Sequence, residues 1–280
     1  MNNKYNELEL AKDLYENGLQ NMNNIGNELR LVAIYIRRVL DLKPKQLREQ
    51  MYGYSEKFII GYKREKYYPI INRAINNATK KGSCLISIES IPIYKEEVDY
   101  INSVEIESEY EYECRKLMFT ILTKMKLNKE IFNIRNTDED KSCSGKYFKG
   151  GQRKYNELKK QAKISDKIKL NENLFHDLYN SKLVDPKYNG LIEFKFIDKI
   201  NELELHDKAM TINQFDDIGW YYDEYMGDTK IKRCEVCGKL IKIKSNKDTS
   251  TKYCEKCKEE KHREQDRIYQ QNKRDSKIID

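Results

Sequence analysis

Histidine is scarce in this sequence: three occur among 280 residues, and they lie far apart, at positions 176, 206 and 262. This spacing excludes the H-E-x-x-H motif of zinc proteases and any His-hydrophobe-His pair. The phosphate-binding loop G-x-x-x-x-G-K-[ST] is missing as well, because Ser144-Gly145-Lys146 has no preceding glycine and no apolar strand before it. Acidic pairs such as Asp216-Asp217 lie in loop-like segments or at helix starts, where solvated charge or helix capping is the ordinary explanation for them. We therefore expect no catalysis, with a metal-dependent nuclease as the one enzymatic alternative.

Long apolar runs are also absent. A membrane-spanning helix needs about 18 apolar residues or more, and Leu31–Ile36 is among the longest runs present. Glu7 and Glu9 stand where a signal peptide would need its apolar core, so we expect no export. Three isolated cysteines, an odd number, suit a reducing compartment and a cytoplasmic protein without disulfides: Cys84, Cys114 and Cys143.

Four further cysteines form the sharpest motif in the chain. They make two C-x-x-C pairs, Cys234/Cys237 and Cys254/Cys257. Four thiolates at this spacing can surround one zinc ion tetrahedrally, and a site with four protein ligands is structural because no position is left for water or substrate. Gly238 allows the first pair to turn back. The second pair begins a run without Gly or Pro, which predicts a helix. A cysteine turn followed by a cysteine pair at a helix start is the arrangement of a treble clef.

Other interpretations of the cysteines are two redox pairs or a chance pairing in a lysine-rich tail. His262 offers an alternative ligand in place of one cysteine, although four cysteines already complete the set. The HNH nuclease, one treble-clef variant, needs histidines between the two pairs, and none lies between Cys237 and Cys254. We predict one structural Zn²⁺ held by the four cysteines.

Hydrophobic periodicity predicts an α+β fold that is mainly helical. Leu29, Val32 and Ile36 recur at helical spacing, and Pro44 and Gly82 are typical of a helix start and stop. We expect helices over 5–20, 27–42, 45–54 and 66–80, then a strand over 83–92. The predicted parts are a helical domain (1–82), a winged-helix-like domain (83–200), a connecting helix or linker (201–229), and a zinc finger with a C-terminal helix (230–280).

The segment 108–198 has the element order of a winged helix. A helix opened by a capping box at Ser108, a loop over 134–151, two further helices over 153–164 and 171–182, and a hairpin with alternating residues to Phe196 follow one another. In that fold the third helix enters the major groove of DNA. The cations before it would contact phosphates, and Asn171, Asn173 and Asn180 would read base edges. The candidate phosphate contacts are Lys149, Arg153, Lys154, Lys159, Lys160, Lys163, Lys167 and Lys169.

The net charge of +7 is unevenly distributed. Residues 36–82, 141–170 and 229–254 carry +8, +8 and +6, whereas 84–140 and 181–228 carry −6 each. Basic segments that gather on one face would form the electrostatic footprint of a nucleic-acid-binding protein. The alternative is that acidic and basic bands pair within the fold or between subunits. In the zinc finger we expect residues 239–244 to form one strand of a hairpin whose turn is at 245–251. We expect the lysines of this hairpin to contact nucleic acid: Lys239, Lys242 and Lys244.

The only tryptophan lies in an aromatic segment, Phe215–Met226. Its aromatic and aliphatic residues recur at helical spacing, which predicts a helix. We expect this helix to dock the zinc unit onto the body of the protein. The alternative is an exposed patch around Trp220 that binds a protein partner.

The C-terminal pattern Cys-x-x-Cys-Gly-Lys, a basic strand, Tyr-Cys-x-x-Cys and a long charged helix resembles small zinc-finger proteins of phages and mobile elements. The resemblance covers about residues 230–275 and implies nucleic-acid association or regulation. The middle of the chain resembles winged-helix replication initiators and regulators. We expect a non-catalytic protein that binds double-stranded DNA in replication control or transcription regulation. The alternative function is a protein-interaction factor that binds, and inhibits or recruits, a host protein, with zinc purely structural.

Overall fold

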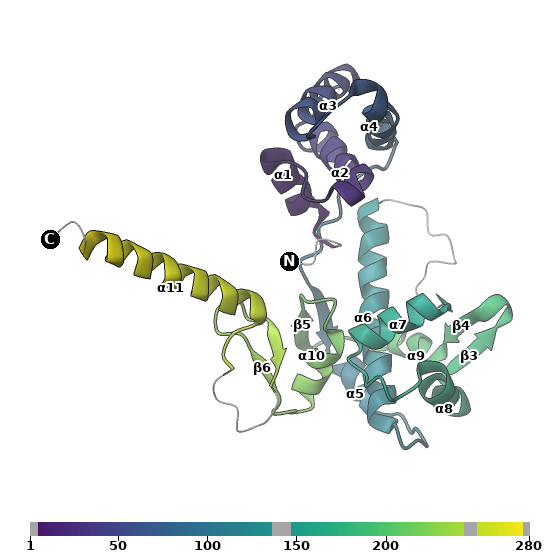
Figure 1. Cartoon of the computed structure of the whole chain (residues 1–280). Helices are drawn as coiled ribbons and strands as arrows, with labels where there is room; N and C mark the ends of the chain where they lie inside the picture. Colours follow the sequence, from purple (N-terminus) through teal and green to yellow (C-terminus); the bar gives the residue numbers. More distant parts are fainter. Residues whose placement is uncertain (1–4, 136–146, 244–250, 277–280) are drawn as a thin grey trace. The chain divides into compact units, whose positions relative to one another are not determined.

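The computed structural model describes residues 5–135, 147–243 and 251–276. The chain is mainly helical with small sheets, which confirms the coarse fold class (Figure 1). No helix in these described ranges is both long and apolar enough to cross a membrane. The chain divides into two compact units, each made of segments that are separate in the sequence. Unit 1 contains residues 1–95, 122–149 and 185–213, and unit 2 contains 96–121, 150–184 and 214–280. The predicted domain boundaries stay predictions.

Unit 1 begins with four helices that match the sequence expectation closely. They are α1 (Glu7–Asn17), α2 (Ile25–Arg38, after a 3-10 turn over Met22–Asn24), α3 (Pro44–Phe58) and α4 (Arg64–Thr79). Pro44 occupies the first turn of α3, where its missing N–H removes no helical hydrogen bond. Gly82 follows α4 with a φ of 78°, a conformation that glycine adopts without a Cβ penalty.

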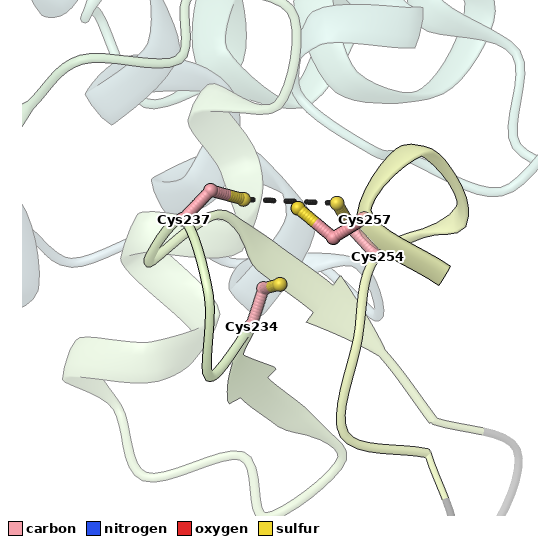
Figure 2. Close-up of side chains that lie close together, drawn as sticks. All are labelled: Cys234, Cys237, Cys254 and Cys257. Carbon is pink, nitrogen blue, oxygen red and sulfur yellow. Dashed lines mark hydrogen bonds between the residues drawn. The ribbon is translucent and has the colours of Figure 1, made fainter. Parts of the chain in front are cut away.

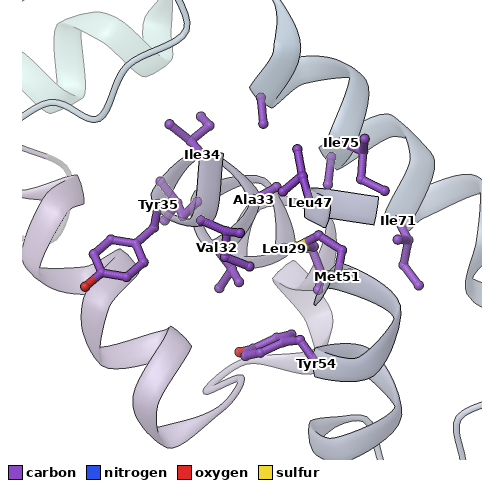
Figure 3. Close-up of a cluster of buried hydrophobic side chains, with 14 of the residues drawn as sticks. Leu29, Val32, Ala33, Ile34, Tyr35, Leu47, Met51, Tyr54, Ile71 and Ile75 are labelled. Atoms are coloured by element: carbon purple, nitrogen blue, oxygen red, sulfur yellow. The ribbon is translucent and has the colours of Figure 1, made fainter. Parts of the chain in front are cut away.

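The core of this helical part forms around α2, which packs against both α1 and α4 (Figure 3). The stripe predicted from the sequence is buried, since Leu29, Val32 and Ile36 are each fully inaccessible. Tyr54 of α3 is buried too, and its hydroxyl donates a hydrogen bond of 2.6 Å to the carbonyl of Leu14 in α1. Burial, reinforced by the charge of Glu28, raises the pKa of Tyr54, so this hydroxyl stays protonated.

The rest of unit 1 contains two small sheets. Strand β1 (Ile91–Tyr94) pairs antiparallel with β5 (Lys208–Ile212). The other sheet has the order β2-β4-β3 and is formed by β2 (Tyr147–Lys149), β3 (Val184–Lys187) and β4 (Leu191–Phe194), with a 3-10 turn over Tyr188–Gly190. Helix α9 (Lys195–Asn201) follows β4 directly.

Three expectations were wrong in this region. The strand expected over 83–92 begins only at Ile91. Of the loop expected over 134–151, residues 136–146 lie outside the described ranges, and the described part after them contains β2. The strand expected to reach Phe196 ends at Phe194, because α9 begins at Lys195. All three errors have one cause: these strands are three or four residues long, so their pairing partners decide their limits more than local alternation does.

Unit 2 is built mainly from helices. They are α5 (Lys95–Ser103), the first part of α6 (Glu111–Arg135), α7 (Gln152–Gln161), α8 (His176–Asn180, entered through a π-helical turn over Leu170–Phe175), α10 (Ile218–Tyr225) and α11 (Glu255–Ser276). A hairpin of β6 (Ile231–Arg233) and β7 (Leu240–Lys242) completes it. The helix expected over 171–182 starts at Leu170, and the Asn173 side chain accepts a hydrogen bond from the N–H of Lys169 at 2.9 Å.

Helix α10 approaches the chain after α7 so closely that only glycine fits at position 219. A methyl group on Gly219 would overlap the carbonyl of Ala162 and crowd the side chain of Lys116. Backbone atoms cannot yield as a flexible side chain does.

We therefore expect Gly219→Ala to destabilise the protein by about 1–3 kcal/mol, because overpacking outweighs the better helix propensity of alanine. Urea unfolding measures the effect. The matched control is Gly53→Ala in α3, where the new methyl group meets no atom within 4 Å. The free energy of unfolding of the control variant should increase by roughly 1 kcal/mol. Equal effects of the two substitutions would contradict the close approach.

Candidate metal centre

The first cysteine pair lies in the turn of the β6–β7 hairpin. Arg233 pairs with Leu240 at the end of the ladder. The turn is closed by two backbone hydrogen bonds, from the N–H of Cys234 to the carbonyl of Lys239 (2.8 Å) and from the N–H of Gly238 to the carbonyl of Cys234 (2.9 Å). Gly238 has a φ of 68°, as expected for a turn that needs glycine.

The hairpin differs from the one expected from the sequence, in which the strand over 239–244 leads into a turn at 245–251. Residues 244–250 lie outside the described ranges. The structure pairs β7 with the preceding β6. Strand β6 has three residues, which is too short to show an alternating pattern in the sequence.

The second cysteine pair lies at the start of α11, as predicted. Cys254 immediately precedes the helix and Cys257 is in its first turn, where the N–H of Lys258 donates to the carbonyl of Cys254 at 2.9 Å. The N–H of Glu235 donates to the carbonyl of Lys252 at 3.0 Å, which ties the hairpin turn to the segment before the helix. These backbone bonds bring together two pairs that are distant in the sequence.

The four sulfur atoms point toward one another (Figure 2). They all lie within 4.8 Å of each other, and the Sγ atoms of Cys237 and Cys254 are 3.7 Å apart. A tetrahedron with zinc–sulfur bonds of about 2.3 Å has sulfur–sulfur edges of roughly 3.8 Å. Three of the cysteines are buried and Cys237 is exposed. This cluster can hold a metal ion, and its donor set and spacing fit a tetrahedral site.

The protonation of the cysteines depends on their close packing. Burial opposes ionisation of Cys234, but the N–H groups of Cys237, Cys254 and Val236 hydrogen-bond to its sulfur and lower the pKa of this thiol to about 6. The pKa of Cys257 is raised, first by its hydrogen bond with Cys237 and then by burial. Four thiolates so close together repel one another, and a bound cation would offset that repulsion.

His262 does not belong to the cluster. It is exposed on α11, and the group of potential ligands among the described residues contains only the four cysteines. The alternative in which this histidine replaces a cysteine therefore finds no support. Apart from Cys257, α11 is exposed over its described side chains.

Helix α10 packs against the hairpin that carries the first cysteine pair. Glu224 of α10 holds the Arg233 guanidinium with two hydrogen bonds of 2.7 and 2.5 Å, which raise the pKa of Arg233. Trp220 is half-buried, and the Lys163 ammonium lies 4.4 Å from its ring centroid. These contacts favour the docking role expected for this helix over a free patch for a protein partner.

The candidate nucleic-acid-binding residues fall into two groups. The first consists of exposed cations that form no ion pair with any described residue: Lys149, Arg153, Lys154, Lys160, Lys167 and Lys242. The second consists of residues whose side chains contact other groups: Lys159, Lys163, Lys169, Lys239 and Asn173. Asn171 is exposed, and Lys244 lies outside the described residues.

Two basic segments meet at one carboxylate. The Nζ atoms of Lys163, after α7, and Lys239, in the hairpin turn, lie 2.6 and 3.8 Å from the two oxygens of Asp217. The sequence around Asp217 indicates only a solvated or capping residue, so its role as a bridge was missed. No local signal could have found it, because both partners are distant along the chain. The acidic band over 181–228 thus pairs in part with the basic bands.

Comparisons of the chain with protein-family models, curated proteins and solved structures gave no match. The metal cluster and the exposed cations of unit 2 are therefore the structural features that bear on function.

Proposed function

We propose that the four cysteines hold one structural zinc ion. The support is the donor set, since four thiolates at this spacing suit a borderline-soft, tetrahedral cation. Bound zinc would join the hairpin turn to the start of α11. With four protein ligands the site has no open position, so its contribution is to folding and not to a reaction.

We further propose that the protein binds double-stranded DNA without catalysis. The observation that carries this proposal is the meeting of two basic segments at Asp217, together with exposed cations on these segments that have no acidic partner among the described residues. Arg153, Lys154, Lys160, Lys167 and Lys242 belong to unit 2 and to these two segments. Unpaired cations on neighbouring segments favour contact with a phosphate backbone, which supplies most of the affinity of such proteins.

The element order supports a winged helix as the DNA-binding fold. Helix α6, β2, α7, the π turn with α8, β3 and β4 follow one another along the chain, and the sheet order is β2-β4-β3. In a winged helix the third helix reads the major groove, which gives that role to the segment 170–180. Asn171 is exposed there and suits base contact, whereas the oxygen of Asn173 already accepts a backbone N–H.

The biological setting that we propose rests on the resemblance of the sequence motifs. The C-terminal pattern is similar to that of small zinc-finger proteins of phages and mobile elements, and the middle region resembles winged-helix replication initiators. We place the protein in replication control or transcription regulation of such an element. The competing function is interaction with a host protein, and the contacts of Trp220 with Lys163 speak against a free patch at that tryptophan.

Binding to a labelled duplex, measured by fluorescence anisotropy, tests the proposal. Affinity should fall by orders of magnitude between roughly 50 and 200 mM salt, because several phosphate contacts release counterions. The double substitution Arg153→Ala/Lys154→Ala removes two of these cations, both exposed, and should weaken binding to the duplex and reduce the salt dependence.

The matched control removes the same charge elsewhere, by Lys256→Ala/Lys258→Ala on α11. Both control lysines are exposed and lie outside the basic segments. The control should keep nearly full affinity. If the wild-type protein, with metal confirmed, fails to bind the duplex at the lower salt, the proposal is wrong and a protein partner becomes the better hypothesis.

A further inference from the structure

A second surface with nucleic-acid chemistry lies on α3 and α4, far along the chain from the cations of unit 2. Two half-exposed tyrosines, two arginines and an asparagine line it, and we call this set the tyrosine strip: Arg48, Tyr52, Arg64, Tyr68 and Asn72. All five residues belong to unit 1. None of them is among the residues proposed to contact duplex DNA.

The strip is held in place by its own contacts. The rings of Tyr52 and Tyr68 are stacked, with centroids 6.4 Å apart and an interplanar angle of 23°. The Arg64 guanidinium lies 4.8 Å from the ring centroid of Tyr52. Asn72 accepts hydrogen bonds from Arg48 (3.2 Å) and from the Tyr52 hydroxyl (3.5 Å). The rings and guanidinium groups are thus ordered before any ligand arrives.

The strip is also accessible. Tyr68 is 48% exposed, although a tyrosine needed only for the helical core would be covered. Both arginines are exposed, and so are further cations on the same two helices or the turn between them: Lys45, Lys63 and Lys66. Tyr62 and the buried Tyr67 form a second stacked pair, and the Lys66 Nζ lies 5.3 Å from the Tyr67 centroid.

We propose that the tyrosine strip binds single-stranded nucleic acid, with bases stacking on Tyr68 and phosphates contacting Arg48 and Arg64. Ordered aromatic rings among cations are the combination that binds unpaired bases without reading sequence, because every base has a π face. Bases of a duplex are already stacked on one another and cannot reach these rings. The residues 36–82 carry a net charge of +8, which attracts the backbone.

Two other classes of partner fit the strip less well. A membrane surface would need several apolar side chains to insert, and Ile60, 96% exposed, is the only strongly exposed apolar side chain in the turn between α3 and α4. A protein partner would favour an apolar centre with few charges, whereas cations surround the exposed ring of Tyr68.

The test uses the full-length protein and a labelled oligothymidylate of about 16 nucleotides, followed by anisotropy beside the duplex measurement. Tyr68→Ala should weaken oligothymidylate binding roughly 5- to 150-fold, the loss expected for one stacked base. Tyr68→Phe keeps the ring and should bind like the wild type. Arg64→Ala should weaken binding and lower its salt dependence. Duplex affinity should change little in all three variants.

The matched control is Tyr269→Ala on α11, which removes a tyrosine that is 63% exposed outside the strip and should leave binding unchanged. Unaltered oligothymidylate affinity in Tyr68→Ala, or an equal loss in Tyr269→Ala, would overturn the proposal. The proposal would also be overturned if anionic vesicles bound the wild type but not Tyr68→Ala, while oligothymidylate bound neither protein. A wild type that binds the duplex but not the oligothymidylate refutes this inference alone, and the reverse result refutes the duplex proposal alone.

Discussion

The double substitution Cys254→Ser/Cys257→Ser is expected to reduce bound zinc from one equivalent to none and to unfold the C-terminal module. Serine hydroxyls remain protonated and cannot replace thiolates as ligands. Binding free energies of closed four-ligand zinc sites are about 10–16 kcal/mol, and in small modules this energy is folding energy.

Loss of the metal should be detectable through the folding of helix α11. It has 22 residues, and its described side chains beyond Cys257 are exposed, so within the described chain it packs on nothing over most of its length. Ion pairs along it, such as Lys256 with Glu260 and Arg263 with Glu259, contribute only a few tenths of a kcal/mol each. Most helical stability in proteins comes from tertiary contacts, and among the described residues this helix is anchored only at its start. Far-UV circular dichroism and protease resistance should therefore both decrease when the metal is removed.

Cys84→Ser is the matched control. It makes the same chemical change at a thiol of unit 1 that is outside the cluster, where Cys84 contacts the carbonyl of Ile134. This variant should retain one equivalent of zinc by elemental analysis and an unchanged protease pattern. A Cys254→Ser/Cys257→Ser protein with full zinc and undiminished protease resistance would falsify the metal assignment.

The largest single-residue effect on stability is expected from Asp223→Ala. Asp223 of α10 forms an ion pair of 2.6 Å with Lys116 of α6 and accepts a hydrogen bond of 2.7 Å from Tyr112. The side chains of the pair are only 7% and 3% exposed. Burial lowers the pKa of Lys116, and the charge of Asp223 opposes that shift. Removing the aspartate therefore leaves a buried ammonium group without its counter-charge. We expect a loss of about 3–5 kcal/mol in urea unfolding.

The double substitution Lys116→Met/Asp223→Leu distinguishes a buried charge from lost packing. Replacing both partners with apolar residues of similar volume should recover most of the stability, because no uncompensated charge remains. Glu172→Ala serves as the surface control: its pair with Lys169 is 67% exposed on both sides and should be worth less than about 1 kcal/mol. If Asp223→Ala is as mild as this control, the buried pair does not hold α10 in place.

Asp223→Ala should also affect the metal centre indirectly. Helix α10 carries Glu224 and follows Asp217, and these two carboxylates hold Arg233 and Lys239 of the cysteine hairpin. When α10 loosens, the hairpin turn loses these partners. Zinc transfer to a chelator should therefore be faster in Asp223→Ala than in the wild type or in Glu172→Ala.

Much of the fold was predictable where the signal is local. The helices of residues 7–79 follow from apolar spacing, with Pro44 and Gly82 at helix limits, because a helix hydrogen-bonds within itself. Strands β2, β5 and β6 were missed for the opposite reason. They have three to five residues and exist through pairing with residues elsewhere in the chain, as β5 does with β1.

The same division applies to the candidate sites. The cysteine cluster was predictable from the sequence, because two C-x-x-C pairs with Gly238 leave few ways to place four sulfur atoms. Which charges are free depends on the tertiary structure. Asp217 pairs with both Lys163 and Lys239, and Asp223 pairs with Lys116, whereas Arg153 and Lys154 stay exposed. Cysteine spacing is a local constraint, whereas an ion pair joins residues that only the folded chain brings together.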